Sequence, residues 1–174
     1  MPLQEANSSR HNINDFAREK FSELAKKYID ALNSKIHNTA VITRDQSEKI
    51  INVLQSKLSA EKVSGRFSHW CKQTFTLCFI GSHQLLCDFK EVKPIFVYQD
   101  MYDIYQASHH QTAHGGRDKC LEYIAANYSW TNRSLLQIFI AQCSACQTRK
   151  TVYLYYINII KFFPNFQNPC SNQL

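Results

Sequence analysis

Two short stretches, His110-Gln-Thr-Ala-His114 and Cys143-Ser-Ala-Cys146, decide the expected fold of the C-terminal part of the chain, and 28 residues separate them. Structural zinc is held by four imidazole nitrogens or thiolate sulfurs at the corners of a tetrahedron. Two histidines one helical turn apart project from the same side of a helix. Two cysteines three positions apart wrap a tight turn around an ion. The pattern therefore predicts one zinc site with four protein ligands.

The ligands expected from this spacing are His110, His114, Cys143 and Cys146. His109 is the alternative to His110, because ligand spacings vary, and we favour His110. A thioredoxin-like redox pair at the two cysteines is a rival interpretation, but such a pair opens a helix after a strand, whereas this one follows a predicted helix. Four protein ligands leave no coordination position for water. A single structural Zn²⁺ is therefore expected rather than redox or hydrolytic chemistry.

The residues around these stretches follow a helical period. A first helix is expected to begin near Met101 and to run into His109 and His110. Gly115-Gly116 then interrupts it. A second helix is expected over 117–127, and Asn132 can cap a third, because its side chain can accept from the first free N–H groups. The pattern predicts a zinc-stabilised three-helix module, similar to a helix-turn-helix, over 99–150. Its expected core is Ile104, Leu121, Ile124, Trp130, Leu135, Leu136 and Phe139.

Three further segments carry a family resemblance: Ala107-Ser-His-His-Gln-Thr-Ala-His-Gly-Gly-Arg-Asp-Lys119, Tyr128-Ser-Trp130 and Cys143-Ser-Ala-Cys-Gln-Thr-Arg-Lys150. Together they resemble the N-terminal zinc-binding (H2C2, or HHCC) module of retroviral and Gypsy-type integrases. That module reads His, a short gap, His-x-Gly-x-x-Lys, an aromatic pair ending in Trp, and Cys-x-x-Cys-Gln-x-x-Lys. Two upstream stretches, Ser64-Gly-Arg-Phe-Ser-His-Trp70 and Phe75-Thr-Leu77, resemble the region that precedes this module in proteins encoded by host genes derived from Gypsy or Ginger-type integrases. The resemblance implies the same zinc ligands, namely His110 (or His109), His114, Cys143 and Cys146.

The resemblance also implies roles in DNA-end contact and self-association. In integrases a ribonuclease-H-like core with an Asp, Asp, Glu triad follows the zinc module. Here 24 residues follow Lys150 and contain no Asp or Glu. Two-metal phosphoryl transfer needs carboxylates to hold its ions. We therefore expect that this chain is not an enzyme. Cys120 also stands where the family has Thr, which is a small side chain of similar size.

The charge balance makes a polyanion a plausible partner. The net charge is +6, and residues 111–150 contain five basic and two acidic side chains. Basic side chains on one module attract DNA phosphates in a salt-dependent way. The alternative is an ordinary solvated basic face. The candidate phosphate contacts are Arg117, Lys119, Arg133, Arg149 and Lys150.

The N-terminal region, 1–62, is predicted to form a helical hairpin. After a frayed polar start over 1–11, apolar residues such as Phe21 and Tyr28 recur at helical spacing from about Asn12. A second helix is expected from Thr43, because Thr43 and Gln46 fit a capping box. Gly65 is expected to end that helix. Its expected buried stripe is Ile50, Ile51, Leu54 and Leu58.

A small antiparallel β-meander is expected over 63–98. Residues 73–80 are rich in aromatic and β-branched side chains, and Gly81-Ser82 reads as a turn. Residues 84–88 then return, and 94–98 form a third short strand. The expected fold class is therefore mainly α with a small antiparallel β-meander, in which the helical hairpin precedes the zinc module.

The last segment, 151–174, is an apolar tail that we expect to be disordered or divergent. Its apolar run from Val152 to Phe163 is short for a membrane span. Residues 1–20 show no apolar segment of a secretory signal. Seven cysteines without such a signal favour a reducing compartment. We therefore expect a nuclear or cytoplasmic protein that is not secreted.

These observations favour a non-catalytic, integrase-derived zinc-binding protein that binds DNA or mediates assembly. The expected partners are DNA, a second copy of the chain or other nuclear proteins, with no membrane and no small-molecule substrate. The alternative is a protein–protein interaction module in which the zinc ion is purely structural. Salt-dependent DNA binding that is lost on charge reversal at Arg117 and Lys119 distinguishes the two.

Overall fold

The computed structural model describes residues 3–33, 40–57 and 63–152, with only the backbone described for 3–14 and Ile80. As the sequence predicted, these parts are mainly helical with a small antiparallel sheet. A further helix covers 144–152. The remaining elements, in chain order, are α1 (Leu3–Asp30), α3 (Arg44–Leu54), α4 (Gly65–Thr74), β1 (Phe75–Ile80), β2 (His83–Asp88), the 3-10 helix η1 (Tyr98–Asp100), α5 (Met101–Gln111), α6 (Arg117–Asn127) and α7 (Arg133–Ala141).

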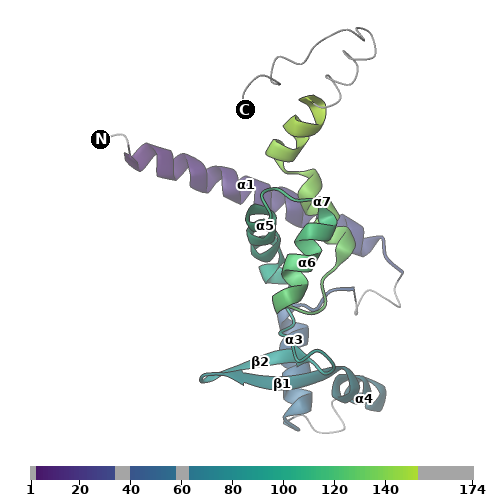
Figure 1. Ribbon diagram of the computed structural model, residues 1–174. Helices are drawn as coiled ribbons and strands as arrows, with labels where there is room; N and C mark the ends of the chain where they lie inside the picture. The colour runs from purple at the N-terminus through teal and green to yellow at the C-terminus, as the bar shows by residue number, and fades with distance from the viewer. Residues whose placement is uncertain (1–2, 34–39, 58–62, 153–174) are drawn as a thin grey trace, which may run out of the picture.

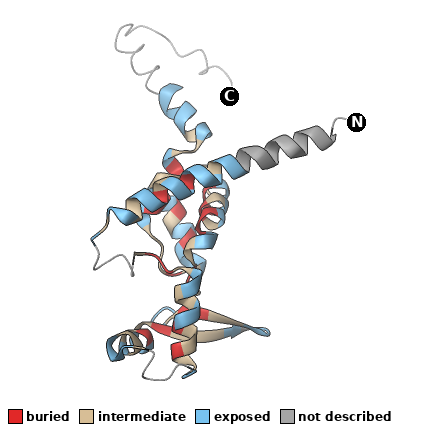
Figure 2. Ribbon diagram, turned by 180° about the vertical axis from the view of Figure 1, so that it is seen from behind, coloured by how far each residue is buried: buried red, intermediate tan, exposed pale blue. Residues whose placement is uncertain are grey.

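The buried residues form two clusters, one at each end of an elongated molecule (Figure 1). The first cluster joins α1, α5, α6 and α7, and the second joins α3, α4 and the two strands. Figure 2 shows buried residues where these elements face one another and exposed residues on their outer sides. The helix expected to run from near Met101 into His109 and His110, the helix expected over 117–127 and the helix capped by Asn132 are confirmed.

Helix α1 packs on α5 and α7 instead of pairing with α3. Phe21 is 4% exposed and its ring lies 5.7 Å from Tyr102 and 5.9 Å from Phe139, measured between centroids. The Arg18 guanidinium lies 4.7 Å from the centroid of the Tyr102 ring and also pairs with Asp103. The predicted helical hairpin is therefore wrong. The helical period identified the buried face of α1 correctly, but it carries no information about which helix covers that face.

The N-terminal boundaries also differ from expectation. Helix α1 already begins at Leu3, where a frayed start was predicted. Thr43 caps α3 as predicted, because its hydroxyl accepts from the N–H of Gln46. Gly65, however, begins α4 and does not end α3, which stops at Leu54. The reason is Ser64, whose hydroxyl accepts from the N–H of Phe67 at 3.3 Å and so starts a new helix.

Within the predicted stripe of α3, Ile50 is fully buried, whereas Ile51 and Leu54 are half-buried. Leu58 lies outside the described residues.

The sheet has two strands in the described residues, with β1 and β2 antiparallel and Phe75 paired with Asp88. Gly81 takes a φ of +61° in the turn between them, a conformation that favours glycine. The predicted third strand over 94–98 is wrong. Pro94 and Ile95 make only isolated bridges, to Cys87 and to Ser129, because proline has no N–H to donate to a ladder.

Trp130, which follows α6 in the chain, packs against the second cluster. Its ring centroid lies 5.2 Å from that of Phe75 and 6.3 Å from that of Trp70, and its Nε1–H donates to Asp88 at 3.2 Å. Trp130 therefore packs against the α3–α4–sheet cluster, although the sequence placed it in the core of the zinc module. The pKa of Asp88 is lowered: burial alone would raise it, but the N–H groups of Glu91 and Lys90 and the Trp130 indole outweigh burial.

The apolar tail that was expected to be disordered or divergent lies outside the described residues from position 153 onward. Thr151 and Val152 end the helix over 144–152 and are exposed. Among the described helices, none combines the length and the apolar character needed to span a bilayer.

Candidate metal centre

The C-terminal end of α5 folds back on itself and carries two histidines. The N–H of Ala113 donates to the His110 carbonyl at 3.0 Å, and the N–H of His114 donates to the His109 carbonyl at 2.8 Å. These two bonds form a Schellman motif, which satisfies carbonyls at a helix end. Ala113 and His114 take φ values of +50° and +58°. The reversal brings the His114 ring to 4.8 Å from the His109 ring, between centroids.

The two cysteines lie where α7 ends and the next helix begins. Gln142 is the C-cap of α7, and the N–H of Cys143 donates to the Ile140 carbonyl at 3.1 Å. The helix over 144–152 then starts, and the N–H of Gln147 donates to the Cys143 carbonyl at 3.0 Å. Cys146 therefore lies in the first turn of this helix, with Cys143 just before it. Both cysteines are half-buried.

Ligand atoms of His109, His114, Cys143 and Cys146 all lie within 4.8 Å of one another. His109 Nε2 lies 3.2 Å from His114 Nδ1, Cys143 Sγ lies 3.3 Å from His114 Nδ1, and Cys146 Sγ lies 3.3 Å from His109 Nε2. Around tetrahedral zinc, bonds of about 2.0–2.1 Å to nitrogen and 2.3 Å to sulfur separate neighbouring ligand atoms by about 3.3–3.8 Å. The donor set and its spacing fit one zinc ion.

The structure places His109 in this cluster and His110 outside it. His109 is 2% exposed, whereas His110 is exposed. The preference for His110 is corrected for a physical reason: α5 ends at Gln111, so His114 is not one helical turn beyond His110. The sequence did contain a signal for His109. It follows the buried Tyr102 and Tyr105 at steps of three and four residues and so continues the inward face of α5.

The second ring nitrogen of His109 is held by the backbone. Its Nδ1 lies 3.1 Å from the Gly115 carbonyl oxygen. A proton on Nδ1 leaves Nε2 free to bind a metal, which is the arrangement of most metal-binding histidines. Cys120 Sγ lies 3.7 Å from the same Nδ1 and 3.4 Å from the Gly115 carbonyl. Cys120 is therefore a fully buried neighbour of the site, as its small size suggested, and lies outside the four-ligand cluster.

Gly115 is required by the close approach of the chain to Thr112. A Cβ at position 115 would lie 2.9 Å from Thr112 Oγ1. The Thr112 hydroxyl cannot move away without losing a hydrogen bond, because it donates to the Ser108 carbonyl at 2.8 Å. The glycine after His114 therefore allows the loop to pass close enough for its carbonyl to reach His109.

Burial and neighbouring charges affect the ionisation of the ligands. Burial lowers the pKa of His109, and the nearby His114 lowers it further. The neutral imidazole that a metal requires is thus favoured. Burial raises the pKa of the Cys146 thiol, as does its neighbour Cys143. Zinc binding is therefore expected to release thiol protons, since thiolates are the form that binds zinc.

One comparison with known proteins bears on this site. Residues 100–152 match a protein-family model described as the integrase zinc binding domain. This segment is an integrase zinc-binding domain. The match spans the four clustered residues and ends just beyond Lys150. Neither the curated proteins nor the solved structures contain a significant match to the chain.

The basic residues predicted to contact DNA all lie exposed on the integrase zinc-binding domain. Arg117 and Lys119 belong to α6, Arg133 begins α7, and Arg149 and Lys150 lie in the helix over 144–152. Arg117 Nε pairs with Asp118 at 3.0 Å. The hydrogen bond from Arg117 and its charge lower the pKa of Asp118, and the charge of Arg133 adds to the effect. Arg117 and Arg133 therefore both stabilise the ionised form of the Asp118 carboxylate.

Replacing Ala113 by glycine should stabilise the zinc-loaded protein. Ala113 has a φ of +50°, and a non-glycine residue in this conformation costs about 1 kcal/mol or more. We expect the free energy of unfolding to rise by about 1 kcal/mol in urea titrations. Ala107→Gly is the matched control, because Ala107 is an exposed interior residue of the same helix and should lose about 1 kcal/mol. A loss in both variants would contradict the strained C-cap.

Proposed function

We propose that the chain is a non-catalytic, integrase-derived zinc protein whose zinc-binding domain attaches to duplex DNA through the phosphate backbone. In this proposal the zinc ion is structural and fixes α5, α6 and α7 relative to the helix over 144–152. The residues quoted above suggest a host protein of Gypsy or Ginger-type origin, similar to KRAB-A domain-containing protein 2. We also propose that it acts in the nucleus.

The observation that supports DNA binding is the position of the basic side chains around the metal centre. Arg149 and Lys150 follow Cys146 by three and four residues in the same helix, so both lie on the side of that helix that carries the ligand. A zinc ion would link the turn that precedes α6 to the end of α7 and the start of the helix over 144–152, and these three helices carry the five cations. Phosphate contacts of this kind position a protein on DNA without reading base sequence. Sequence-independent, salt-dependent binding is therefore the expected behaviour.

Charge reversal at Arg117 and Lys119 tests this proposal. The zinc-loaded full chain is titrated into a fluorescein-labelled duplex of about 20 base pairs, and anisotropy is followed at several salt concentrations. We expect Arg117→Glu with Lys119→Glu to weaken binding and to make the slope of log K against log salt shallower by about 2. A matched control reverses Lys20 and Lys72, which are exposed on α1 and α4.

Equal weakening in the control would show that only overall charge matters and would contradict the proposal. A wild-type chain that binds zinc but shows no salt-dependent affinity for the duplex would also contradict it. That result would favour the alternative function, a protein–protein interaction module held together by structural zinc.

A further inference from the structure

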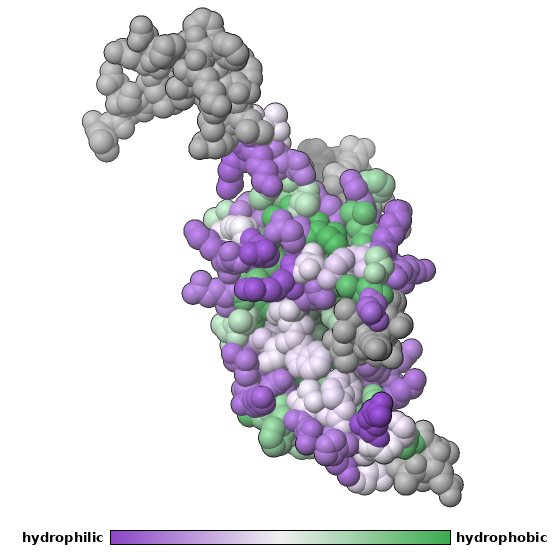
Figure 3. Space-filling model, turned by 90° about the vertical axis from the view of Figure 1, so that its right-hand side faces the viewer, coloured by the Kyte–Doolittle hydropathy of each residue, from purple (hydrophilic) through white to green (hydrophobic). Residues whose placement is uncertain are grey.

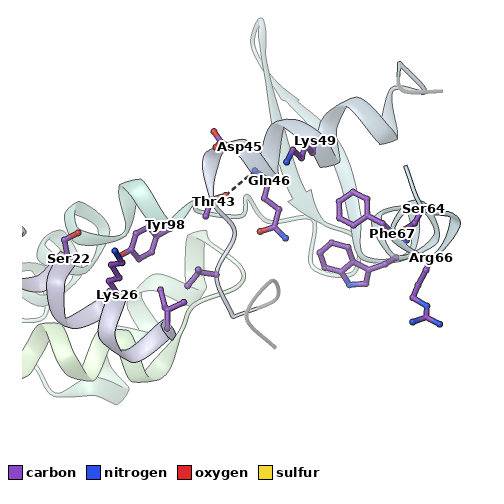
Figure 4. Close-up of a pocket in the computed structure, with 13 residues that line it drawn as sticks. Ser22, Lys26, Thr43, Asp45, Gln46, Lys49, Ser64, Arg66, Phe67 and Tyr98 are labelled. Carbon is purple, nitrogen blue, oxygen red and sulfur yellow. Dashed lines mark hydrogen bonds between the residues drawn. The ribbon is translucent and has the colours of Figure 1, made fainter. Parts of the chain in front are cut away.

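A cleft of about 960 Å³ lies outside the integrase zinc-binding domain, between α1 and α4. The start of α3 lies between these two helices and also lines the cleft (Figure 4). In that view Ser22 and Lys26 of α1 lie on one side and Phe67 and Arg66 of α4 on the other. The volume is at the upper end of the roughly 300–1,000 Å³ that ligand pockets enclose. None of the residues lining it belongs to 100–152.

The charged side chains of the cleft are mostly basic. Lys26, Lys49 and Arg66 line it from three different helices, and Asp45 is the one acidic residue among the described lining residues. All three cations are exposed. None of them forms an ion pair with a carboxylate of the described residues, in contrast to Lys27, which pairs with Glu23 in α1. The cleft therefore presents positive charge that the described protein does not neutralise.

Aromatic rings occupy the walls between these cations. Phe67, Trp70 and Tyr98 line the cleft and are each half-buried. The Trp70 ring is held by its neighbours, with centroids 5.7 Å from Phe67 and 5.0 Å from Phe75. A partly exposed ring that is fixed from behind is a preformed surface for stacking. The side of the molecule on which α4 lies shows a band of intermediate hydropathy bordered by hydrophilic side chains (Figure 3).

We propose that this cleft binds a short segment of single-stranded nucleic acid. Phosphates would contact Lys26, Lys49 and Arg66, and one or two bases would stack on Trp70 and Phe67. Proteins that bind single strands without sequence preference combine a basic groove with aromatic rings in this way. The Ser22, Thr43 and Ser64 hydroxyls in the lining can each donate a hydrogen bond, which suits a polar and partly wet ligand.

The composition of the lining favours a single strand over the other occupants. A duplex keeps its bases stacked inside, so it cannot offer base faces to rings on the walls of a cleft. An acidic amphipathic peptide would use the same cations, but its helix packs aliphatic side chains into an apolar groove. The apolar residues in the described lining are three aromatic rings, on Phe67, Trp70 and Tyr98, and only two aliphatic side chains, on Ile29 and Val41. Flat rings suit the stacking of bases. This site is separate from the basic face proposed to bind duplex DNA, so each can fail without the other.

The test uses the zinc-loaded full chain and a fluorescein-labelled deoxythymidine oligonucleotide of about ten residues. We expect Lys49→Glu with Arg66→Glu to weaken binding about tenfold or more at 0.1 M salt. The wild-type slope of log K against log salt should be about −2, because about three phosphates are contacted at roughly −0.7 each. Arg117→Glu with Lys119→Glu should leave this affinity within about twofold, while it weakens duplex binding.

The two tryptophans provide a readout that does not depend on any variant. The chain contains Trp70 and Trp130 only. Trp130 Nε1–H is engaged with Asp88 and Trp130 does not line the cleft, so it serves as an internal control. In ¹H–¹⁵N spectra the oligonucleotide should shift the indole signal of Trp70 more than that of Trp130.

Three results would overturn the proposal. The first is an oligonucleotide that does not bind, and the second is one that binds without shifting the Trp70 indole signal. The third is equal competition by a decamer of glutamate, which would show general attraction of anions without base stacking. In the same spectra, addition of the duplex should not shift the Trp70 indole signal.

Discussion

His109→Gln is expected to abolish stoichiometric zinc binding, whereas His110→Gln retains it. His109 is buried with its Nε2 among the ligand atoms, and His110 is the exposed neighbour. Even the loss of an outer-shell partner weakens metal binding about 10–100-fold. Removal of a ligand should therefore weaken it by at least about a hundredfold. Zinc per chain after dialysis, measured by mass spectrometry, tests both variants side by side.

The same pair of variants should differ in stability. A ligand present at 1,000 times its Kd adds about 4.1 kcal/mol to the folded state. For a chain of this size about 1 kcal/mol shifts the thermal midpoint by roughly 2–4 °C. We therefore expect His109→Gln, and chelation of the wild type, to lower the midpoint by about 8–16 °C, and His110→Gln to change it by less than about 2 °C. Loss of zinc in His110→Gln would contradict the assigned ligand set.

Tyr105→Ala should be the most damaging core substitution outside the metal centre. Tyr105 is fully buried, its ring packs 6.1 Å from Phe21 and 6.0 Å from Phe96 between centroids, and its hydroxyl donates to the Asn132 carbonyl at 2.9 Å. Burial raises the pKa of Tyr105, so the phenol stays neutral and remains a donor. Truncation of a buried aromatic residue costs about 3–5 kcal/mol.

Tyr105→Phe is the control that separates the ring from the hydroxyl. It keeps the aromatic packing and leaves the Asn132 carbonyl without this donor, at a cost of about 1–2 kcal/mol. Urea titrations of the zinc-loaded chain measure both free energies of unfolding. Equal losses of unfolding free energy in the two variants would show that packing of the ring contributes little. That result would contradict the buried position of Tyr105 in the first cluster.

The zinc-binding domain was predictable because its signals are local. Asn132 precedes an apolar stripe and caps α7, accepting from the N–H groups of Ser134 and Leu135. The His and Cys pairs stand at helix ends, where a short spacing limits how far apart the side chains can lie. The choice between His109 and His110 required one further fact, namely that α5 ends at Gln111 and reverses through Ala113. Alanine at the reversal hides it, since glycine is the usual residue there.

The arrangement of the N-terminal half was not predictable in the same way. The period of α1 showed that Phe21 is buried, but its neighbours Tyr102 and Phe139 are far along the chain. Trp130 shows the same limit. Its size predicts burial, yet its contacts with Phe75 and Asp88 depend on where the sheet lies relative to the zinc-binding domain. Pairing between distant elements is a tertiary property that local propensity does not determine.

Zinc K-edge X-ray absorption of the purified full chain, with the metal content measured on the same sample, is the decisive test of the four-ligand centre. We expect one zinc per chain, with two sulfur neighbours at about 2.3 Å and two nitrogen neighbours at about 2.0–2.1 Å. That shell corresponds to Cys143, Cys146, His109 and His114. A folded chain without zinc, or a zinc ion with a single sulfur neighbour and bound water, would contradict a closed structural site.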